Sequence, residues 1–124
     1  MASCFYSRFV TLNIHNVVIN CENPQRLAEF WTRALEMDVL EDYDSFVELG
    51  RPGSPVTLGL QHVPECRTGP NRVHIDLHGE PREAAAQRLV ELGATIRGEQ
   101  SPPGLDLVWT VLTDPEGNEF CITD

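Results

Sequence analysis

The first strong pattern in the chain is a β-branched run followed by apolar residues at helical spacing. Residues 17–20, Val-Val-Ile-Asn, are typical of a buried strand. Asn23 then offers an N-cap, and Pro24 stands at the first helical position, where its missing N–H costs nothing. We therefore predict a helix over residues 24–36 with one apolar face that packs in the core. That face comprises Leu27, Phe30, Trp31, Ala34 and Leu35.

The rest of the chain has the pattern of short strands and one further helix. Clusters of proline and glycine at residues 50–55, 101–104 and 114–118 predict loops and turns. A second helix is expected from Pro81 up to Gly93, which supplies the stop. The expected strands are residues 39–40, 45–49, 56–62, 72–78, 95–97, 107–113 and 119–123.

The order strand, helix, three strands therefore occurs twice, and the residues also repeat. Residues 16–20 align with residues 74–78 at an offset of 58, and from Pro24 and Pro81 onward the offset is 57. An internal repeat with a single indel indicates two copies of one supersecondary unit.

This repeat predicts an α+β fold built from two βαβββ modules. We expect the modules to cover about residues 14–62 and 72–123, within a single domain over residues 1–124. Their strands should form one incurved, mixed and mostly antiparallel sheet, with one helix behind each module.

Alternation along the first strand of the second module separates two faces. Ile75 and Leu77 should point toward the helices, whereas His74, Asp76 and His78 should point the other way. A polar group that is buried without a partner costs roughly 2 to 7 kcal/mol. The face opposite the helices is therefore predicted to be a pocket that holds a ligand, water or a metal.

Charge and composition exclude several classes of partner. The net charge is −10, from nineteen acidic and nine basic residues, so we expect no binding to nucleic acid, which needs clustered positive charge. No apolar run approaches the roughly 18 to 20 residues of a transmembrane helix, and the start of the chain lacks the pattern of a signal peptide. We expect a soluble, cytoplasmic protein that binds no membrane.

The reactive side chains narrow the chemistry further. All nine basic residues are arginine, and the absence of lysine excludes Schiff-base chemistry. The cysteines have no metal-site spacing and are expected to be free thiols in a reducing compartment. They are Cys4, Cys21, Cys66 and Cys121.

Four motifs together resemble the glyoxalase-like branch of the vicinal oxygen chelate superfamily. The resemblance covers about residues 14–123. The motifs are Pro-x-x-Leu-Ala-x-Phe-Trp at 24–31, Arg-Val-His-Ile-Asp-Leu at 72–77, Leu-Gly-Ala at 92–94 and Asp-Pro-Glu-Gly-Asn-Glu-Phe-Cys at 114–121. Members of this superfamily include glyoxalase I, extradiol dioxygenases, epimerases, thiol-transferring fosfomycin-resistance enzymes and bleomycin-binding proteins.

The resemblance also implies where a metal would bind. In metal-using members, ligands begin the first strand and end the last strand of each module, which corresponds to Asn16, a residue near Gln61, His74 and Cys121. Of these, only His74 is a usual ligand type, so a divalent metal is an option that this donor set disfavours. A ligand set of His74 with Asp76 or Cys121 would be easier to bring around one metal ion than the full set of four positions. A second departure is Glu36-Met37, where such chains usually carry glycine.

Two functional hypotheses follow from the resemblance. The first is a lyase-, isomerase- or transferase-type enzyme, or one related to the dioxygenases, that acts on a small oxygenated or thiol-conjugated metabolite with His74 as the catalytic acid–base group. The second is a non-catalytic protein of the bleomycin-resistance type that sequesters a drug-like or aromatic ligand. In both cases we expect a small-molecule ligand and a homodimer. The candidate ligand-binding residues are Asn16, Gln61, His74, Asp76, Trp109 and Cys121.

Overall fold

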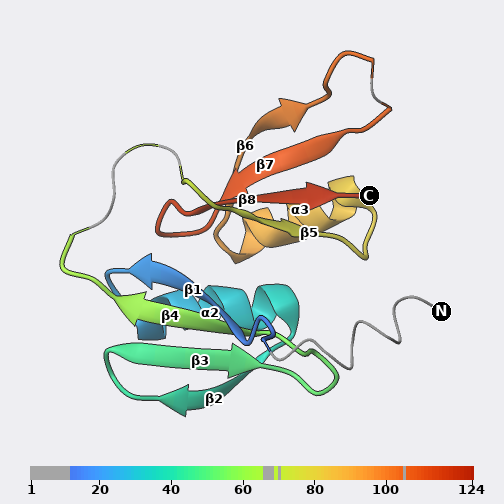
Figure 1. Cartoon of the computed structure of the whole chain (residues 1–124). Helices are drawn as coiled ribbons and strands as arrows, with labels where there is room; N and C mark the ends of the chain where they lie inside the picture. The colour runs from blue at the N-terminus through green and yellow to red at the C-terminus, as the bar shows by residue number, and fades with distance from the viewer. Residues whose placement is uncertain (1–11, 66–68, 70, 105) are drawn as a thin grey trace.

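The structure is a computed structural model that describes residues 12–65, 69, 71–104 and 106–124. In this part of the chain, strand, helix and three strands follow one another twice, which confirms the predicted two-module α+β fold (Figure 1). The elements are β1 (Asn16–Cys21), α2 (Pro24–Leu35), β2 (Asp38–Asp42), β3 (Phe46–Gly50), β4 (Thr57–His62), β5 (Ile75–Leu77), α3 (Arg82–Leu92), β6 (Thr95–Gln100), β7 (Trp109–Thr113) and β8 (Glu119–Thr123). Neither helix of this part of the chain is long and apolar enough to cross a membrane.

Each module forms its own four-stranded sheet. The first sheet has the order β1-β4-β3-β2 and the second has the order β5-β8-β7-β6. In both sheets the first strand pairs in parallel with the last strand of its module, and the other pairs are antiparallel, as a mixed, mostly antiparallel sheet requires. The sequence predicted one continuous incurved sheet. Among the described residues, β1 and β5 instead face each other as edges of two sheets (Figure 1).

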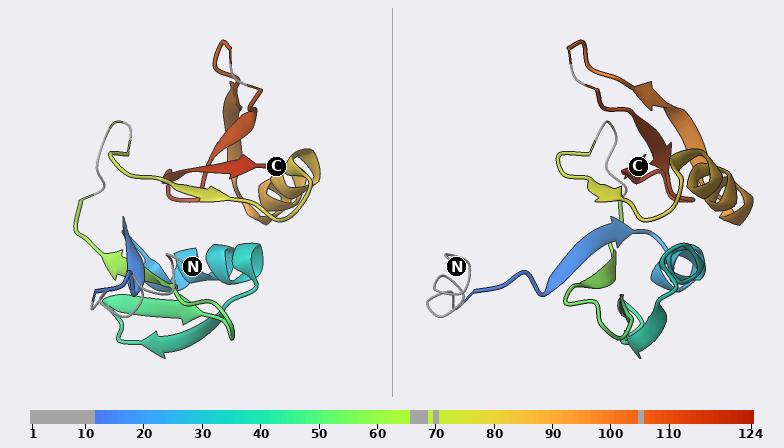
Figure 2. Two further views of the ribbon diagram at one scale, coloured as in Figure 1. Left: turned by 45° about the vertical axis from the view of Figure 1, so that its right-hand side comes forward. Right: turned by 90° about the vertical axis from the view of Figure 1, so that its right-hand side faces the viewer.

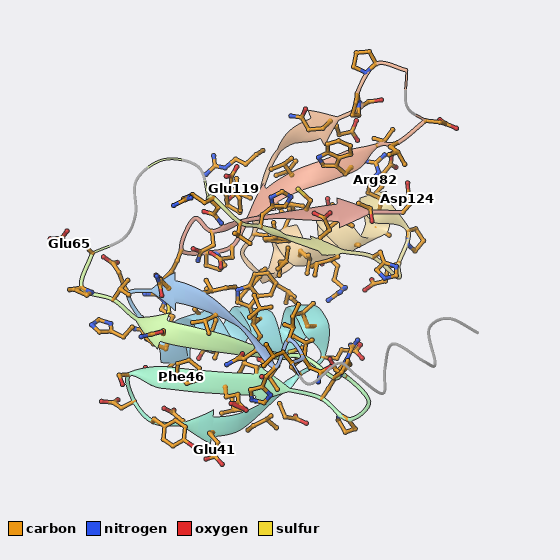
Figure 3. The ribbon with its side chains drawn as sticks, viewed as in Figure 1. Glu41, Phe46, Glu65, Arg82, Glu119 and Asp124 are labelled. Atoms are coloured by element: carbon orange, nitrogen blue, oxygen red, sulfur yellow. The ribbon has the colours of Figure 1, made fainter. Side chains whose placement is uncertain are left out.

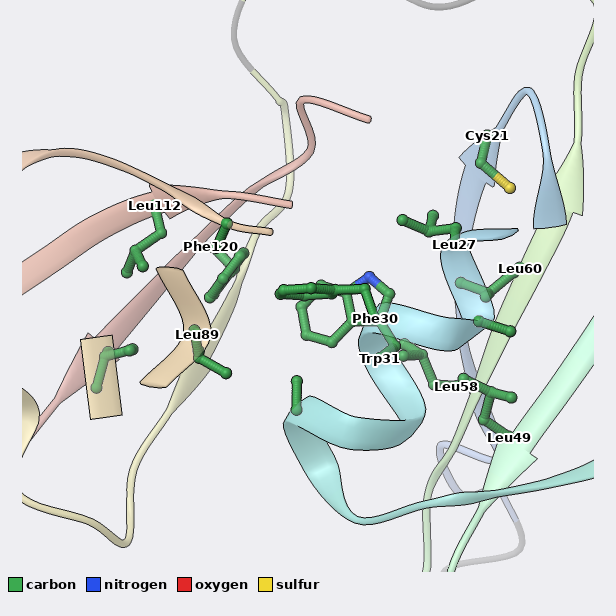
Figure 4. Close-up of a cluster of buried hydrophobic side chains, with 14 of the residues drawn as sticks. Cys21, Leu27, Phe30, Trp31, Leu49, Leu58, Leu60, Leu89, Leu112 and Phe120 are labelled. Atoms are coloured by element: carbon green, nitrogen blue, oxygen red, sulfur yellow. The ribbon is translucent and has the colours of Figure 1, made fainter. Parts of the chain in front are cut away.

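Packed side chains join the two sheets. A single sheet would instead have joined them by backbone hydrogen bonds between strands. Helices α2 and α3 contact each other on the same side of both sheets (Figure 2). Trp31 of α2 is fully buried, and its ring lies 5.0 Å from the rings of both Phe30 and Phe120. Figure 4 shows how this aromatic group lies between the leucines of the two modules. The prediction that Phe30 and Trp31 are core residues is confirmed.

Three sets of hydrogen bonds also connect the modules. The indole Nε1 of Trp31 donates to the Asp114 carboxylate at 3.0 Å. The Glu116 carboxylate accepts the backbone N–H of Asn23 at 3.0 Å, at the start of α2. Arg88 of α3 donates to backbone carbonyls in the last turn of α2. These contacts hold the second module, and its sheet, in a defined place against α2.

Helix α2 begins and ends close to the predicted residues. The Asn23 side chain accepts the N–H of Arg26 at 3.1 Å, and Pro24 is the first helical residue. The helix ends at Leu35, and Glu36 adopts the left-handed conformation with φ of 52°. The position where glycine was expected therefore has the backbone shape that favours glycine, although a glutamate occupies it.

The first strand of the second module is shorter than expected. The sequence predicted a strand over residues 72–78, whereas β5 is Ile75–Leu77, which pairs with β8 over those three residues. His78 consequently lies beyond the strand. It was expected on the same face as His74, but that face ends before it. Strand β7 also begins later than expected, at Trp109, whereas β6 continues beyond residue 97 to Gln100.

Candidate functional site

The second sheet carries a cavity on the face that the helices leave open. Its volume is about 520 Å³, within the usual range for small-molecule sites. We call it the second-sheet cavity. Its wall is formed by β5, β7, β8 and the loop before β7. The lining residues are His74, Asp76, Asp106, Leu107, Val108, Trp109, Val111, Glu119, Cys121, Thr123 and Asp124.

Strand alternation explains which side chains reach this cavity. On β8, Cys121 and its neighbours two positions away line the cavity, whereas Phe120 and Ile122 are 1% and 2% exposed in the core. On β5, Ile75 and Leu77 pack against the core and Asp76 lines the cavity. The predicted alternation of core and pocket side chains is therefore confirmed for residues 75–77, whereas His78 lies beyond the strand and does not line this cavity.

His74, Asp76 and Cys121 come together at one point of the cavity wall. Asp76 and Cys121 are paired in the parallel register of β5 and β8, and His74 directly precedes β5. The Nε2 atom of His74 lies 3.3 Å from Oδ1 of Asp76. One ligand atom from each of the three residues lies within 4.8 Å of the other two.

The Cys121 thiol is held in its protonated form. Burial raises the pKa of this thiol, and the negative charges of Asp76 and Glu119 raise it further. Cys121 is 5% exposed and lines the cavity as a free thiol. Without a bound cation, this environment does not favour a thiolate nucleophile.

The three clustered donors fit a divalent metal ion of the zinc class. An imidazole, a carboxylate and a thiol offer nitrogen, oxygen and sulfur, and catalytic zinc sites use three protein ligands with one open position. The sequence identified His74 alone as a usual ligand type. The structure brings its two compact partners from the sequence analysis, Asp76 and Cys121, together with it, so this donor set could hold the metal that the resemblance implies.

Asn16 and Gln61, the other two predicted residues, lie on the first sheet and do not line this cavity. The side-chain nitrogen of Asn16 lies against Gly59, where a Cβ would collide with it. Its Oδ1 is buried and has no hydrogen-bond partner among the described residues. Gln61 is exposed on β4. His78 lines a separate cavity of about 440 Å³ between the modules.

Several lining residues were absent from the sequence prediction. Glu119 and Thr123 could have been found, because each is two positions from Cys121 on the same strand. Val111 has the same relation to Trp109. No sequence signal places residues 106–108 over the cavity, because the path of a loop across a sheet leaves no periodic pattern.

Comparison with known proteins agrees with this architecture. The family model of the glyoxalase-like domain matches residues 16–123. A glyoxalase/bleomycin resistance protein/dioxygenase family enzyme from Burkholderia phytofirmans superposes with a TM-score of 0.70 at 19% identity, over 90% of this chain and 97% of that one. A glyoxalase family protein from Enterococcus faecalis gives 0.71 at 20% identity, over 92% and 98%.

A possible glyoxalase from Bacillus cereus gives a TM-score of 0.68 at 18% identity, over 92% of this chain and 100% of that one. These identities are low, so the structural neighbours establish the fold alone. The search of curated proteins gives no match. Because the family model spans nearly the whole described chain, this protein belongs to the glyoxalase-like domain family of the vicinal oxygen chelate superfamily.

Proposed function

We propose that this protein is a glyoxalase-like enzyme that binds a small oxygenated or thiol-conjugated molecule in the second-sheet cavity. The observation that supports this most directly is the convergence of His74, Asp76 and Cys121 at the wall of a ligand-sized cavity. Polar side chains of these types, gathered in a concave site, are the usual machinery of proton transfer and metal binding.

His74 is the group that would exchange a proton with the ligand. Imidazole is well suited to general acid–base catalysis near neutral pH. The Asp76 carboxylate, 3.3 Å from Nε2, orients the ring and leaves Nδ1 for the ligand. If His74, Asp76 and Cys121 instead hold a divalent ion, His74 would serve as a ligand in place of the acid–base group, and the ion would supply Lewis-acid polarisation of a substrate oxygen.

The test compares two neighbouring residues with opposite orientations. Wild-type protein, His74→Ala and Leu77→Ala are screened by thermal shift against zinc and a panel of small metabolites, and unfolded in urea. His74→Ala should abolish the response to the best probe and change the free energy of unfolding by less than about 1 kcal/mol. Leu77→Ala should keep that response and cost about 2 kcal/mol. If His74→Ala is the more destabilising change, His74 is a structural residue and the proposal is wrong.

We also propose a homodimer in which a second copy completes this site. Val18 and Leu40 are large exposed hydrophobics on strands of the first sheet, and the buried Oδ1 of Asn16 lacks a partner there. If this surface of one copy covers the second-sheet cavity of the other, Asn16 and Gln61 reach the ligand. The predicted residue set would then lie in one site.

Light scattering and complementation test the dimer. A monomer of 13.9 kDa at micromolar concentration would contradict it. Chains carrying His74→Ala and chains carrying Asn16→Ala should each fail to bind the best probe as pure proteins. After unfolding and refolding together they should recover part of the binding, because a mixed dimer contains one site with both residues intact.

The apolar part of the wall favours a second candidate, a protein that sequesters its ligand without catalysis. Leu107, Val108 and Trp109 form a hydrophobic surface that suits an aromatic or drug-like molecule. The two functions differ in what happens to the ligand. A sequestering protein returns the bound molecule unchanged, and mass spectrometry after prolonged incubation separates the two cases.

A further inference from the structure

The charged side chains of the second-sheet cavity are mostly of one sign. Four carboxylates line it, and no arginine does so among the described residues. The chain contains no lysine that could take that place. The four are Asp76, Asp106, Glu119 and Asp124.

Within the part of the chain that the structure describes, only one of these carboxylates is paired with an arginine. Arg82 lies 3.5 Å from Asp124 at the end of β8, and it also pairs with Glu99 at 2.7 Å (Figure 3). Glu119, at the opposite end of β8, accepts a backbone N–H from Asn71 and has no ion-pair partner among the described residues. Asp106 likewise has none in that part of the chain, where Asp76 is paired only with the imidazole of His74.

The same negative environment reaches the floor of the cavity. Cys121 is 5% exposed, and no hydrogen bond to its thiol is found within the described residues. Asp76 is paired with Cys121 across β5 and β8, and Glu119 lies two positions before it on β8. An anionic ligand placed here would be repelled by several carboxylates, and among the described residues only Asp124 has a guanidinium beside it to offset its charge.

Beside the carboxylates stands a hydrophobic wall with an indole. Trp109 begins β7 and is paired in register with Thr123, next to Asp124. Leu107 and Val108 precede it and line the same cavity. Indole is the most favourable aromatic surface for a cation, and the neighbouring aliphatic groups suit the apolar part of a ligand.

We propose that the second-sheet cavity selects an organic cation, an amine or ammonium group on an apolar body, over neutral and anionic molecules of the same shape. The juxtaposition of unpaired carboxylates with Trp109 supplies both parts of this recognition. The inference rests on the proposed function, because it names the ligand class of the same cavity.

The experiment uses three probes that share a phenyl ring and an ethyl linker: phenethylammonium, phenethyl alcohol and hydrocinnamate. Calorimetry measures their affinities for the full chain, and two-dimensional NMR identifies the residues that respond. Phenethylammonium should bind at least about tenfold more tightly than either other probe. Its binding should shift the indole signal of Trp109 and leave the indole signal of Trp31 unchanged.

Two variants test the source of the selectivity. Glu119→Gln keeps an oxygen acceptor for the Asn71 N–H and removes the charge. It should weaken phenethylammonium about three- to tenfold and leave phenethyl alcohol within about twofold. Glu29→Gln, at an exposed carboxylate on α2 away from the cavity, is the matched control and should change neither affinity.

Three outcomes would overturn the inference. If phenethyl alcohol or hydrocinnamate binds in the cavity as tightly as phenethylammonium, charge selectivity is wrong and the proposed binding site stands. If none of the probes binds while zinc shifts the signals of His74 and Cys121, cation recognition is wrong and the metal-capable site is retained. If neither the probes, zinc nor the metabolite panel perturbs the cavity, both the inference and the proposed function fail.

Discussion

Helices α2 and α3 occupy equivalent places in the two modules, but they bury different kinds of side chain. At the offset of 57, Trp31 of α2 corresponds to Arg88 of α3, and Phe30 corresponds to Gln87. Trp31 is fully buried in the core that the modules share. The Arg88 side chain is 38% exposed and donates to the last turn of α2. Helix α2 therefore supports both modules, whereas α3 packs mainly against its own sheet.

The sheet faces that the helices leave open also differ, and again the first module carries the packed side chain. The pairing register makes Gly59 the counterpart of Cys121, because Val18 pairs with Gly59 and the equivalent Asp76 pairs with Cys121. The Phe46 ring lies where a Cβ at residue 59 would be. At this position the first sheet is covered by the packed Phe46 ring, whereas the second sheet exposes the Cys121 thiol to the cavity. The repeat thus separates structural support in the first module from candidate chemistry in the second.

Paired truncations of the equivalent helix residues should give the largest difference between the modules. Trp31→Ala is expected to lower the free energy of unfolding by about 3 to 5 kcal/mol, because it leaves a cavity beside Phe120 and removes the hydrogen bond to Asp114. Arg88→Ala should cost about 1 to 2 kcal/mol through lost hydrogen bonds at the end of α2. Urea unfolding measures both. Equal losses would show that the two helices contribute alike, contrary to the asymmetry described here.

Asp114 is the next strongest test, since it joins the modules with a buried carboxylate. It is 3% exposed and accepts hydrogen bonds from Trp31, from Asn118 and from the backbone N–H of Glu116. Asp114→Asn presents an amide to these donors, so we expect a loss of about 2 kcal/mol. Asp38→Asn, at an exposed carboxylate on β2, is the control and should stay within about 0.5 kcal/mol of wild type.

The same variant predicts a pH dependence with a definite sign. Burial raises the pKa of Asp114 above its ordinary 3.8, and its hydrogen bonds offset this only in part. At pH values above 3.8, up to the raised pKa of the folded state, the folded chain binds more protons than the unfolded chain, so the contribution of Asp114 to stability falls as pH rises. The gap in unfolding free energy between wild type and Asp114→Asn should therefore be wider near about pH 4 than near about pH 7. A gap that is constant or widens with rising pH would contradict this.

These contacts also show which features local sequence patterns could predict. Helix α2 was predictable because Asn23, Pro24 and the apolar spacing act within a few residues of one another. The two faces of β5 were predictable because alternation is local as well. The bond from Trp31 to Asp114 spans 83 positions and leaves no local signal.

The same limit applies to the sheets and the cavity wall. Alternation along β1 and β5 does not state whether these edges pair with each other, so one sheet was expected where two are found. Residues 106–108 reach the cavity only through the path of the loop. The convergence of Asp76 and Cys121 depends on the register of β5 and β8, which the sequence left open.

The smallest expected effect lies at the ends of the two helices, where the repeat places Glu36 and Gly93 at equivalent positions. Glu36 has φ of 52° and ψ of 47°, a left-handed conformation that costs a non-glycine residue roughly 1 to 2 kcal/mol. Its exposed side chain makes no hydrogen bond or ion pair within the described residues, so its removal should sacrifice little. Glu36→Gly should therefore stabilise the protein by about 1 kcal/mol, after allowance for the greater freedom of glycine in the unfolded chain.

Two further variants sharpen this last comparison. Glu36→Asn should fall between wild type and Glu36→Gly, because asparagine tolerates the left-handed region better than glutamate does. Gly93→Ala should have the opposite sign. Gly93 has φ of 124°, and a Cβ there would lie 3.3 Å from the ring of Pro115, so we expect a loss of more than about 1 kcal/mol. Thermal unfolding of the three variants should rank Glu36→Gly above Glu36→Asn and both above Gly93→Ala. A Glu36→Gly protein that melts below wild type would mean that Glu36 makes a compensating interaction in solution.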